Sequence, residues 1–409
     1  MPRWVIPLIA IDVVFLPFPH LGPIPLKASY LVVGFFALLI VRQGRLDRYI
    51  PRILVAGFGL LILATMVGYL VFLISGGSAF SETARNLLVF TLAPLAFIVG
   101  AADRRERHNY VPWLLVLYLF VTTTFTIYAT ELEWIAELYG LRERVATGIY
   151  SVRSQGLHYN ANISALFASL LVLFLYAGIK YGFVRARPWI VVAAVVAGGG
   201  VVLMLISRNQ IVAFSILALL ILWSAAPQHR FRWTTALVAV LVALVVFAAP
   251  LGGLLANTLG YDPIEKVNRA SRALTDTSRP KESILRPVAD IGWALDRWQF
   301  SPIVGTGFDS VETEQLDLSG VAYHNDWLSV IVSSGLIGLA VFAVIVAVIA
   351  RIDIALALPF VLPGATNAFI FAPSHFILFM VIAGLVWSRK RSAISSAEAS
   401  VARRYLPAR

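Results

Sequence analysis

Residues 52–75 read RILVAGFGLLILATMVGYLVFLIS, and no charged side chain follows Arg52 in this stretch. A helix needs about 20 apolar residues to cross the hydrocarbon core of a bilayer. Similar stretches recur along the 409-residue chain, in which 59% of the residues are hydrophobic and only 13% are charged. A soluble domain carries about 25% charged residues. The sequence therefore predicts an all-α, polytopic membrane protein.

The apolar stretches predict about twelve transmembrane helices. Their approximate ranges are 4–19, 25–42, 52–75, 85–101, 110–129, 160–179, 188–206, 210–226, 233–256, 327–350, 352–372 and 374–388. The chain then divides into helices 1–9 (1–256), a long loop with an amphipathic helix (257–326), helices 10–12 (327–388) and a tail (389–409).

The basic residues predict the orientation of these helices. With twelve helices, the clusters in the short loops and after the last helix all fall on one side: Arg42, Arg45, Arg48 and Arg52; Arg104, Arg105 and Arg107; Lys180, Arg185 and Arg187; Arg230 and Arg232; Arg351; Arg389, Lys390 and Arg391. Basic loops stay in the cytoplasm. We therefore expect both termini in the cytoplasm, a periplasmic loop at 257–326 and a multi-pass protein of a bacterial inner membrane, with membrane lipids as partners.

The composition also bears on which kinds of site, partner and targeting segment the chain can have. The chain has no cysteine, which rules out disulfides, zinc–thiolate sites and iron–sulfur clusters. The net charge of +11 arises largely from the short basic loops, so it does not predict a nucleic-acid partner. The first 19 residues lack the small-residue cleavage site of a signal peptide.

Arg208 lies in SRNQ (207–210), a tight connection between two predicted helices on the outer side. The positive-inside rule predicts no cation there, and charged groups at membrane depth are usually functional. An arginine that extends to the outer headgroups is the alternative interpretation.

The long outer loop contains ESILRPVADIGWALDRWQF (282–300), in which apolar residues recur at helical spacing. Arg286 lies near the start of this predicted helix, just before Pro287, which suits a first turn. SPIVGTGFDS follows, and Gly305 and Gly307 allow a tight turn or a close approach to a ligand. A plain amphipathic helix with solvated arginines is the alternative, and Lys266, Arg269, Arg272 or Arg279 could replace Arg286 as a phosphate ligand.

Two further polar segments precede predicted helices at the outer side. SVRSQGLHYNANISALF (151–167) contains Arg153 and Asn162, and the asparagine could be only a helix cap. VAYHNDWL (321–328) contains His324, Asn325 and Asp326. Asn325 or Asp326 can cap the next helix. His324 could be a solvated surface histidine.

Together these residues suit one kind of chemistry. Guanidinium groups bind phosphate oxygens in a bidentate manner. An imidazole, with an ordinary pKa of about 6.5, suits a general base that activates a hydroxyl. Arginines and a histidine at the outer membrane surface therefore indicate a site for a lipid-linked pyrophosphate.

Four motifs in order resemble the O-antigen ligase and polymerase family of bacterial membrane glycosyltransferases: RSQG…YNAN, SRNQ, R…W.AL…SPIVGTG and YHNDWL…SGLIGL. The resemblance covers about 150–345 by motif and the whole chain by topology. It implies inverting transfer of a glycan from undecaprenyl diphosphate to an acceptor sugar at the periplasmic face, without a metal or cofactor.

The resemblance also implies residue roles. His324 would be the catalytic base, and Arg208 and Arg286 would hold the donor diphosphate. Arg153 with Asn162 would support the donor side. Asn325, Asp326, Gly305 and Gly307 would support the site.

Three functions stay open at this point. A ligase would use an outer-core sugar of lipid A as acceptor, and a polymerase would use another carrier-linked repeat of O-antigen, capsule or exopolysaccharide. The sequence does not identify the sugar, the acceptor, the chain length or the oligomeric state. A transporter or flippase is the third possibility, although the predicted helices contain few acids, mainly Asp12 and Asp353.

Overall fold

The computed structural model describes residues 1–16, 20–21, 24–25, 27–43, 49–77, 80–103, 107–128, 161–204, 208–225, 292, 294–308, 325–362, 369 and 373–405. Helices dominate these residues. They are α1 (Val5–Phe15), α2 (Ala28–Arg42), α3 (Arg52–Ile74), α4 (Ser81–Ala102), α5 (Val111–Tyr128), α9 (Ala161–Lys180), α10 (Pro188–Met204), α11 (Arg208–Ala225), α17 (Asp326–Ile352), the 3₁₀ helix η3 (Ile354–Ala357), α18 (Leu358–Val361) and α19 (Pro373–Tyr405). The strands β1 (His20–Leu21) and β2 (Ile24–Pro25) pair antiparallel.

The described helices are those of a membrane protein. Stretches within α3, α4, α9 and α17 are long and apolar enough to cross a bilayer, and α1, α2, α5, α10 and α11 contain shorter apolar segments. The helical class predicted from the sequence is therefore confirmed. The expected helix at 233–256 lies outside the described residues.

The helix expected at 352–372 does not begin as one continuous helix. Asp353 ends α17 in an extended conformation, and its Oδ1 accepts a hydrogen bond from the Ala355 backbone N–H at 2.9 Å. The chain then forms the short η3 and α18, up to Val361, and beyond residue 362 only Phe369 of this segment is described. Pro359 and Pro363 lie four residues apart in this segment, and proline removes a backbone donor and obstructs the preceding helical turn. Apolar composition alone did not indicate this break.

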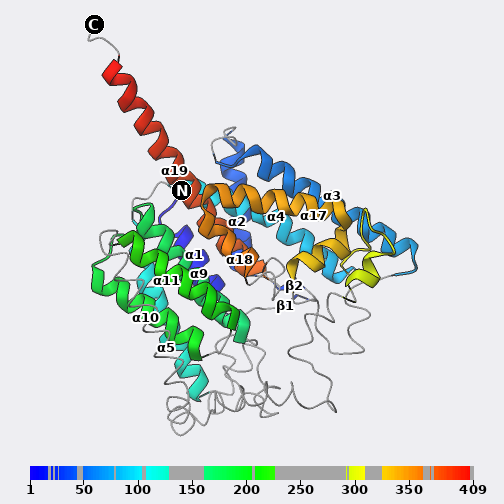
Figure 1. Cartoon of the computed structure of the whole chain (residues 1–409), viewed down its shortest axis with the longest axis horizontal. Coiled ribbons are helices and arrows are strands. Elements are labelled where there is room, and N and C mark those ends of the chain that lie inside the picture. The colour runs from blue at the N-terminus through cyan, green and yellow to red at the C-terminus, as the bar shows by residue number, and fades with distance from the viewer. Residues whose placement is uncertain are drawn as a thin grey trace.

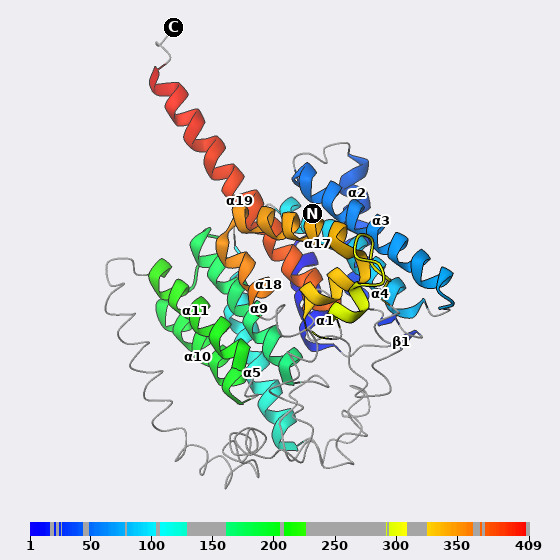
Figure 2. The same ribbon diagram turned by 45° about the vertical axis from the view of Figure 1, so that its right-hand side comes forward.

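The helices form two groups joined by α19. One group contains α5, α9, α10 and α11, and the other contains α2, α3, α4 and α17 (Figures 1 and 2). The first part of α19 packs on both α4 and α9, whereas its last part extends away from the bundle (Figure 1).

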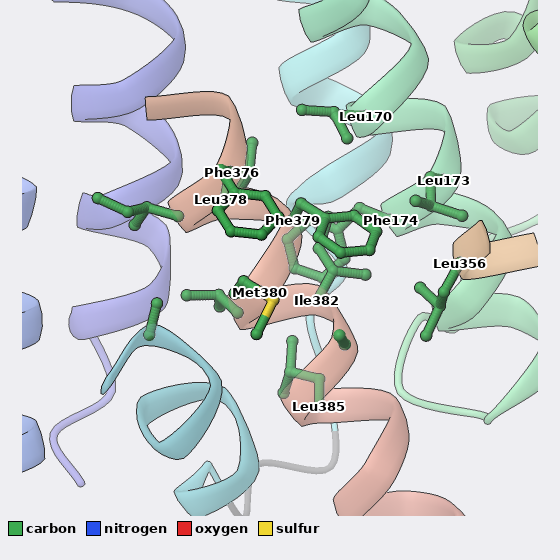
Figure 3. Packing of buried hydrophobic residues seen from close by; sticks show 14 of the residues in the cluster. Leu170, Leu173, Phe174, Leu356, Phe376, Leu378, Phe379, Met380, Ile382 and Leu385 are labelled. Carbon is green, nitrogen blue, oxygen red and sulfur yellow. The ribbon is translucent and has the colours of Figure 1, made fainter. Parts of the chain in front are cut away.

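The core lies around the first half of α19. Residues 376–383 are at most 1% exposed. Figure 3 shows their side chains packed with Leu170, Leu173 and Phe174 of α9 and with Leu356. Helices in a bilayer gain little from hydrophobicity, so close van der Waals packing of this kind holds them together.

The loops expected in the cytoplasm meet at one end of the bundle, called here the basic end. Lys180, the last residue of α9, forms an ion pair with Asp353 after α17, with 2.8 Å between Nζ and Oδ2. The Tyr181 hydroxyl donates to the same Oδ2 at 2.7 Å. Burial and this hydrogen bond raise the pKa of Tyr181, so the phenol stays protonated. Asp353 therefore fixes the ends of two helices.

Two further contacts extend the basic end. Lys390 Nζ donates to the carbonyl oxygen of Arg351 at 2.9 Å, which ties α19 to the end of α17. The Arg185 backbone N–H donates to Asn109 Oδ1 at 2.8 Å, which ties the connection after α9 to the connection before α5. Segments far apart in the sequence therefore share this end.

Gly384→Ala should destabilise the bundle, because a Cβ atom there would lie 2.1 Å from the Phe97 carbonyl oxygen of α4. We expect a loss of roughly 1–3 kcal/mol, as for other overpacked cores. The measurement is the apparent melting temperature in detergent. Gly59→Ala in α3 is the control, since its Cβ would meet nothing within 4 Å. Equal melting temperatures for the two variants would contradict the close α4–α19 contact.

Candidate functional site

The structure describes only some of the predicted site residues. His324, Arg286 and Arg153 lie outside the described residues. Arg208 is the first residue of α11 and Asn162 is the second residue of α9, and for both only the helical position is described. Asn325, Asp326, Gly305 and Gly307 are described in full.

Asn325 caps α17. Its side-chain Oδ1 accepts hydrogen bonds from the backbone N–H groups of Trp327 at 2.9 Å and Leu328 at 3.2 Å. The backbone of Asn325 is extended, as expected for an N-cap. Of the two capping residues that the sequence allowed, the structure selects Asn325.

Asp326 has a different role. Its side chain is fully buried, and Oδ2 accepts a hydrogen bond from the backbone N–H of Phe369 at 3.1 Å. Trp327 Nε1 donates to the Phe360 carbonyl oxygen at 3.1 Å. The residues directly after His324 are therefore held to the segment between α17 and α19.

α17 is sharply bent at Gly335, whose φ of 62° and ψ of −162° are not helical. Trp327 and Phe342 lie on opposite sides of the bend, yet their ring centroids are only 4.8 Å apart. A straight helix would separate these residues by about 22 Å, at 1.5 Å per residue. The first part of α17 therefore folds back beside the second part, whereas the sequence predicted one continuous helix.

Residues 301–307 fill the gap that this bend leaves in the helical hydrogen-bond pattern. In a regular helix, Leu336 and Ile337 would donate to the carbonyl groups of Val332 and Ser333. Here the two N–H groups and the two carbonyl groups of α17 each form a hydrogen bond with the loop at 302–307 instead. The four bonds are Leu336 N to Pro302 O at 2.9 Å, Ile337 N to Ile303 O at 3.2 Å, Thr306 N to Val332 O at 2.8 Å and Gly307 N to Ser333 O at 3.0 Å. Two helical bonds are replaced by four bonds to the loop.

Gly305 and Gly307 make this exchange possible. Both have positive φ, 76° and 80°, which glycine adopts without strain. A Cβ atom on Gly305 would lie 2.4 Å from the backbone of Ser333 and Ser334, and one on Gly307 would lie 3.0 Å from the Tyr69 Cα atom. The sequence allowed a tight turn or a close approach to a ligand here, and the structure shows a close approach to the backbone of α17 and α3.

The helix expected at 282–300 is described only near its end, where residues 294–298 are helical. Ala294 is 1% exposed and packs against Val332, whereas Leu295 is 46% exposed. Trp298 Nε1 donates to the Pro302 carbonyl oxygen at 2.9 Å. The small side chain of Ala294 lets this segment lie close to α17.

Hydrogen bonds link the starts of several helices at the end of the bundle opposite the basic end. The Tyr30 hydroxyl of α2 lies 3.1 Å from Ser374 Oγ of α19, and His375 Nε2 lies 3.3 Å from the Ile163 carbonyl oxygen of α9. α10 runs back from the basic end beside α9, so α11 also begins at this opposite end, with Arg208. The N-terminal ends of helices carry partial positive charge, which favours anions.

Two titratable groups at this end were not singled out from the sequence. Lys27 is 3% exposed, and its Nζ donates to the carbonyl oxygens of Asp12 at 2.6 Å, Val13 at 2.9 Å and Leu16 at 3.0 Å. His375 is 1% exposed and stacks on Phe167 with 3.8 Å between ring centroids. The sequence did contain a signal for each residue. Lys27 is a cation on the predicted outer side, and His375 is a histidine inside an apolar stretch.

Some buried polar atoms here have no hydrogen-bond partner among the described residues. They are His375 Nδ1 and both amide atoms of Gln210, which is fully buried two residues after Arg208. Buried polar atoms are normally paired, so unpaired ones invite explanation by a ligand or water. The described residues contain no cluster of three or more His, Asp or Glu side chains that could hold a metal ion.

The fold and the polar helix starts define a multi-pass helical membrane protein with hydrogen-bonding groups gathered opposite its basic end. Residues 193–343 match the family model described as O-antigen ligase. This match, over a little more than a third of the chain, supports assigning the protein to the O-antigen ligase family. Family members are membrane enzymes of glycan transfer or polymerisation. No curated protein matches the chain.

The matched residues include most of the predicted site. Arg208, Arg286, Gly305, Gly307 and the segment around His324 lie within 193–343. Arg153 and Asn162 lie before it. The bend of α17 and the loop bonded to it are both inside the match, so the described part of the site is built largely from the family region.

Gly305→Ala should loosen the loop from α17, because its Cβ atom would collide with backbone at a residue with positive φ. Such strain costs roughly 1–3 kcal/mol. Hydrogen exchange of the Leu336 and Ile337 amides measures the effect, and we expect faster exchange. Gly292→Ala is the matched control, since a Cβ atom there meets nothing within 4 Å. Unchanged protection of both amides in Gly305→Ala would show that the loop does not hold the bend.

Proposed function

We propose that this protein is an O-antigen ligase-like glycosyltransferase. It moves a glycan from undecaprenyl diphosphate to an acceptor sugar hydroxyl at the periplasmic face, with inversion and without a metal ion or cofactor. For a ligase the acceptor is a sugar of the lipid A core. The observation that carries the proposal is the family match over 193–343, which contains the segments with Arg208, Arg286 and His324.

His324 is the proposed base. It directly precedes Asn325, whose side chain fixes the start of α17. Its imidazole removes the proton from the acceptor hydroxyl while that oxygen attacks the anomeric carbon of the donor sugar. The bond from this carbon to the diphosphate oxygen breaks, and undecaprenyl diphosphate leaves. Attack from the opposite face inverts the anomeric centre.

Arginines are the proposed ligands of the diphosphate. Arg208 is the first residue of α11, where the helix start carries partial positive charge that also favours an anion. Arg286 and Arg153 complete the cationic set, with Asn162 in support at the start of α9. Fixed cations of this kind stabilise the charge that grows on the leaving diphosphate.

The remaining residues support the site through the backbone. Asp326 holds the start of α17 to Phe369, and Gly305 and Gly307 let the loop bond to the bent helix. These contacts fix the chain after residue 325 and between 301 and 308. A rigid backbone on these segments suits a base and a phosphate ligand that must meet one substrate.

We also propose twelve membrane spans with both termini in the cytoplasm. The regions are 1–256, the periplasmic loop 257–326, 327–388 and the tail 389–409. The meeting of basic loops at one end of the bundle supports this orientation. The bacterial inner membrane is the proposed location.

A transporter is not favoured. Asp12 and Asp353 were the main acids inside the predicted helices that could couple an ion, and both are engaged in structural contacts. Asp12 Oδ2 accepts from the Ser29 backbone N–H at 2.8 Å, and Asp353 pairs with Lys180.

His324→Ala should lower turnover by roughly 10²–10⁴-fold, the usual contribution of a general base to a rate. Donor binding should persist. The assay measures transfer from a purified carrier-diphosphate glycan to an acceptor, with a chelator present so that the wild-type rate also tests metal independence. His375→Asn is the comparison variant. Transfer lost in His375→Asn but kept in His324→Ala would move the base to His375.

Arg208→Lys should lower the transfer rate by about 10²–10³, the usual effect of losing a donor that stabilises developing charge. Lysine keeps the charge but cannot form a bidentate pair with phosphate. Arg187→Lys, exposed near the basic end, serves as the control. Near-normal transfer by Arg208→Lys would remove Arg208 from the diphosphate site.

A glycan phenotype separates ligase from polymerase. Loss of a ligase leaves long chains on the carrier lipid, whereas loss of a polymerase leaves single repeats. Size analysis of carrier-linked glycans from a deletion strain therefore decides between the two acceptors.

A further inference from the structure

A cavity of about 950 Å³ lies near the basic end of the bundle, away from the proposed transfer site. It is formed by the chain before α1, the second half of α2, the end of α4, and single residues shortly before α3 and α5. The lining residues that carry the inference are Arg3, Phe36, Leu39, Tyr49, Asp103 and Arg107. Ligand pockets usually measure about 300–1,000 Å³, so this volume suits a sizeable ligand.

One wall of the cavity is apolar and continues into the surface that faces lipid. Phe36 and Leu39 lie on α2, and Leu39 is 40% exposed. Neighbouring α2 side chains point outward, with exposed fractions of 60% at Phe35 and 65% at Leu38. Outward apolar side chains on a membrane helix contact acyl chains. The cavity is therefore continuous with a lipid-facing helix surface.

Trp4 marks the level of the membrane surface beside this wall. Its ring packs edge-to-face on Phe36 with 5.7 Å between centroids, and 53% of the residue is exposed. Tryptophan is enriched at the level of lipid headgroups. The cavity thus lies where a headgroup meets the start of its acyl chains.

The polar side of the cavity is cationic. Arg3 and Arg107 are both exposed, and neither guanidinium forms a hydrogen bond or ion pair within the described part of the chain. Asp103 also lines the cavity, but it is 2% exposed and its Oδ2 lies 3.0 Å from His108 Nε2. An anion that enters the cavity would therefore meet two accessible guanidinium groups. The buried carboxylate of Asp103 already pairs with His108.

We propose that this cavity binds one anionic phospholipid from the leaflet at the basic end. The phosphodiester pairs with the guanidinium groups of Arg3 and Arg107, and an acyl chain lies along Phe36 and Leu39. Basic pockets between membrane helices bind anionic headgroups in this way. Under the orientation proposed above this is the cytoplasmic leaflet. The lipid would join the segment before α1 to the end of α4.

The test is native mass spectrometry of the delipidated full-length protein titrated with dioleoyl phosphatidylglycerol or dioleoyl phosphatidylcholine. We expect one retained phosphatidylglycerol per chain and weaker retention of phosphatidylcholine. The double variant Arg3→Gln, Arg107→Gln should weaken phosphatidylglycerol binding about thirtyfold. Each cation near a membrane surface contributes roughly fivefold to the affinity, and the two factors multiply.

Controls separate this site from general charge effects. Arg187→Gln removes an exposed arginine that does not line the cavity, and it should bind phosphatidylglycerol as the wild type does. Arg3→Lys with Arg107→Lys keeps both charges and should retain most binding. Equal binding of the two lipids, or an unchanged affinity in the double glutamine variant, overturns the proposal. Displacement of the lipid by millimolar inorganic phosphate would also overturn it, because the site would then recognise a free anion.

Discussion

The hydrogen bonds between residues 302–307 and the bend of α17 determine the described part of the site. An unpaired backbone group in hydrocarbon costs several kcal/mol, so a helix can break at membrane depth only where protein replaces its lost bonds. The loop supplies two carbonyl acceptors and two N–H donors to the open turn at Gly335. Buried hydroxyls line the same place, where Thr65 Oγ1 of α3 lies 3.3 Å from Ser334 Oγ. The loop, α3 and α17 therefore form one polar unit inside an apolar bundle.

This arrangement links the long outer loop to the segment that follows His324. The structure describes the chain up to residue 308 and again from residue 325. Residues 302–307 are bonded to α17, and Asn325 caps the same helix. Broken helices of this type are a known way to present backbone groups to a substrate within a membrane. In this protein the backbone groups at the break are occupied by the loop. The chemistry proposed here therefore depends on side chains at the helix starts.

The sequence predicted the helices well, because apolar length is a strong signal for a membrane span. The described α2, α3, α5 and α10 begin or end within a few residues of the predicted ranges. Residue type limited the cap of α17 to Asn325 or Asp326, and the structure selects Asn325. The bend at Gly335 did not, because a glycine inside a helical pattern is usually tolerated. Its partners, residues 302–307, lie about thirty positions earlier, and no local pattern joins them.

Site prediction from sequence was limited in another way. The polar motifs stood out against apolar surroundings, so Arg208, Asn325 and Asp326 could be selected. Lys27 and His375 were not selected, since each is a single polar residue at the edge of a predicted helix. Their significance depends on contacts with α1, α9 and α19, which only the three-dimensional arrangement supplies. The break at Asp353 was missed for the same reason, since the short helices η3 and α18 are as apolar as one continuous helix would be.

The amine of Lys27 also bears on how the protein is made. α1 has only 11 residues, and three carbonyl groups near its end depend on a lysine that comes after the next connection. During synthesis, α1 alone would lack the lysine donor for these carbonyls, and only the Asp12 carbonyl would keep a partner, the backbone N–H of Leu16 at 3.3 Å. The first two helices should therefore leave the translocon as a preassembled hairpin, with the lysine already docked, before the rest of the bundle gathers around them.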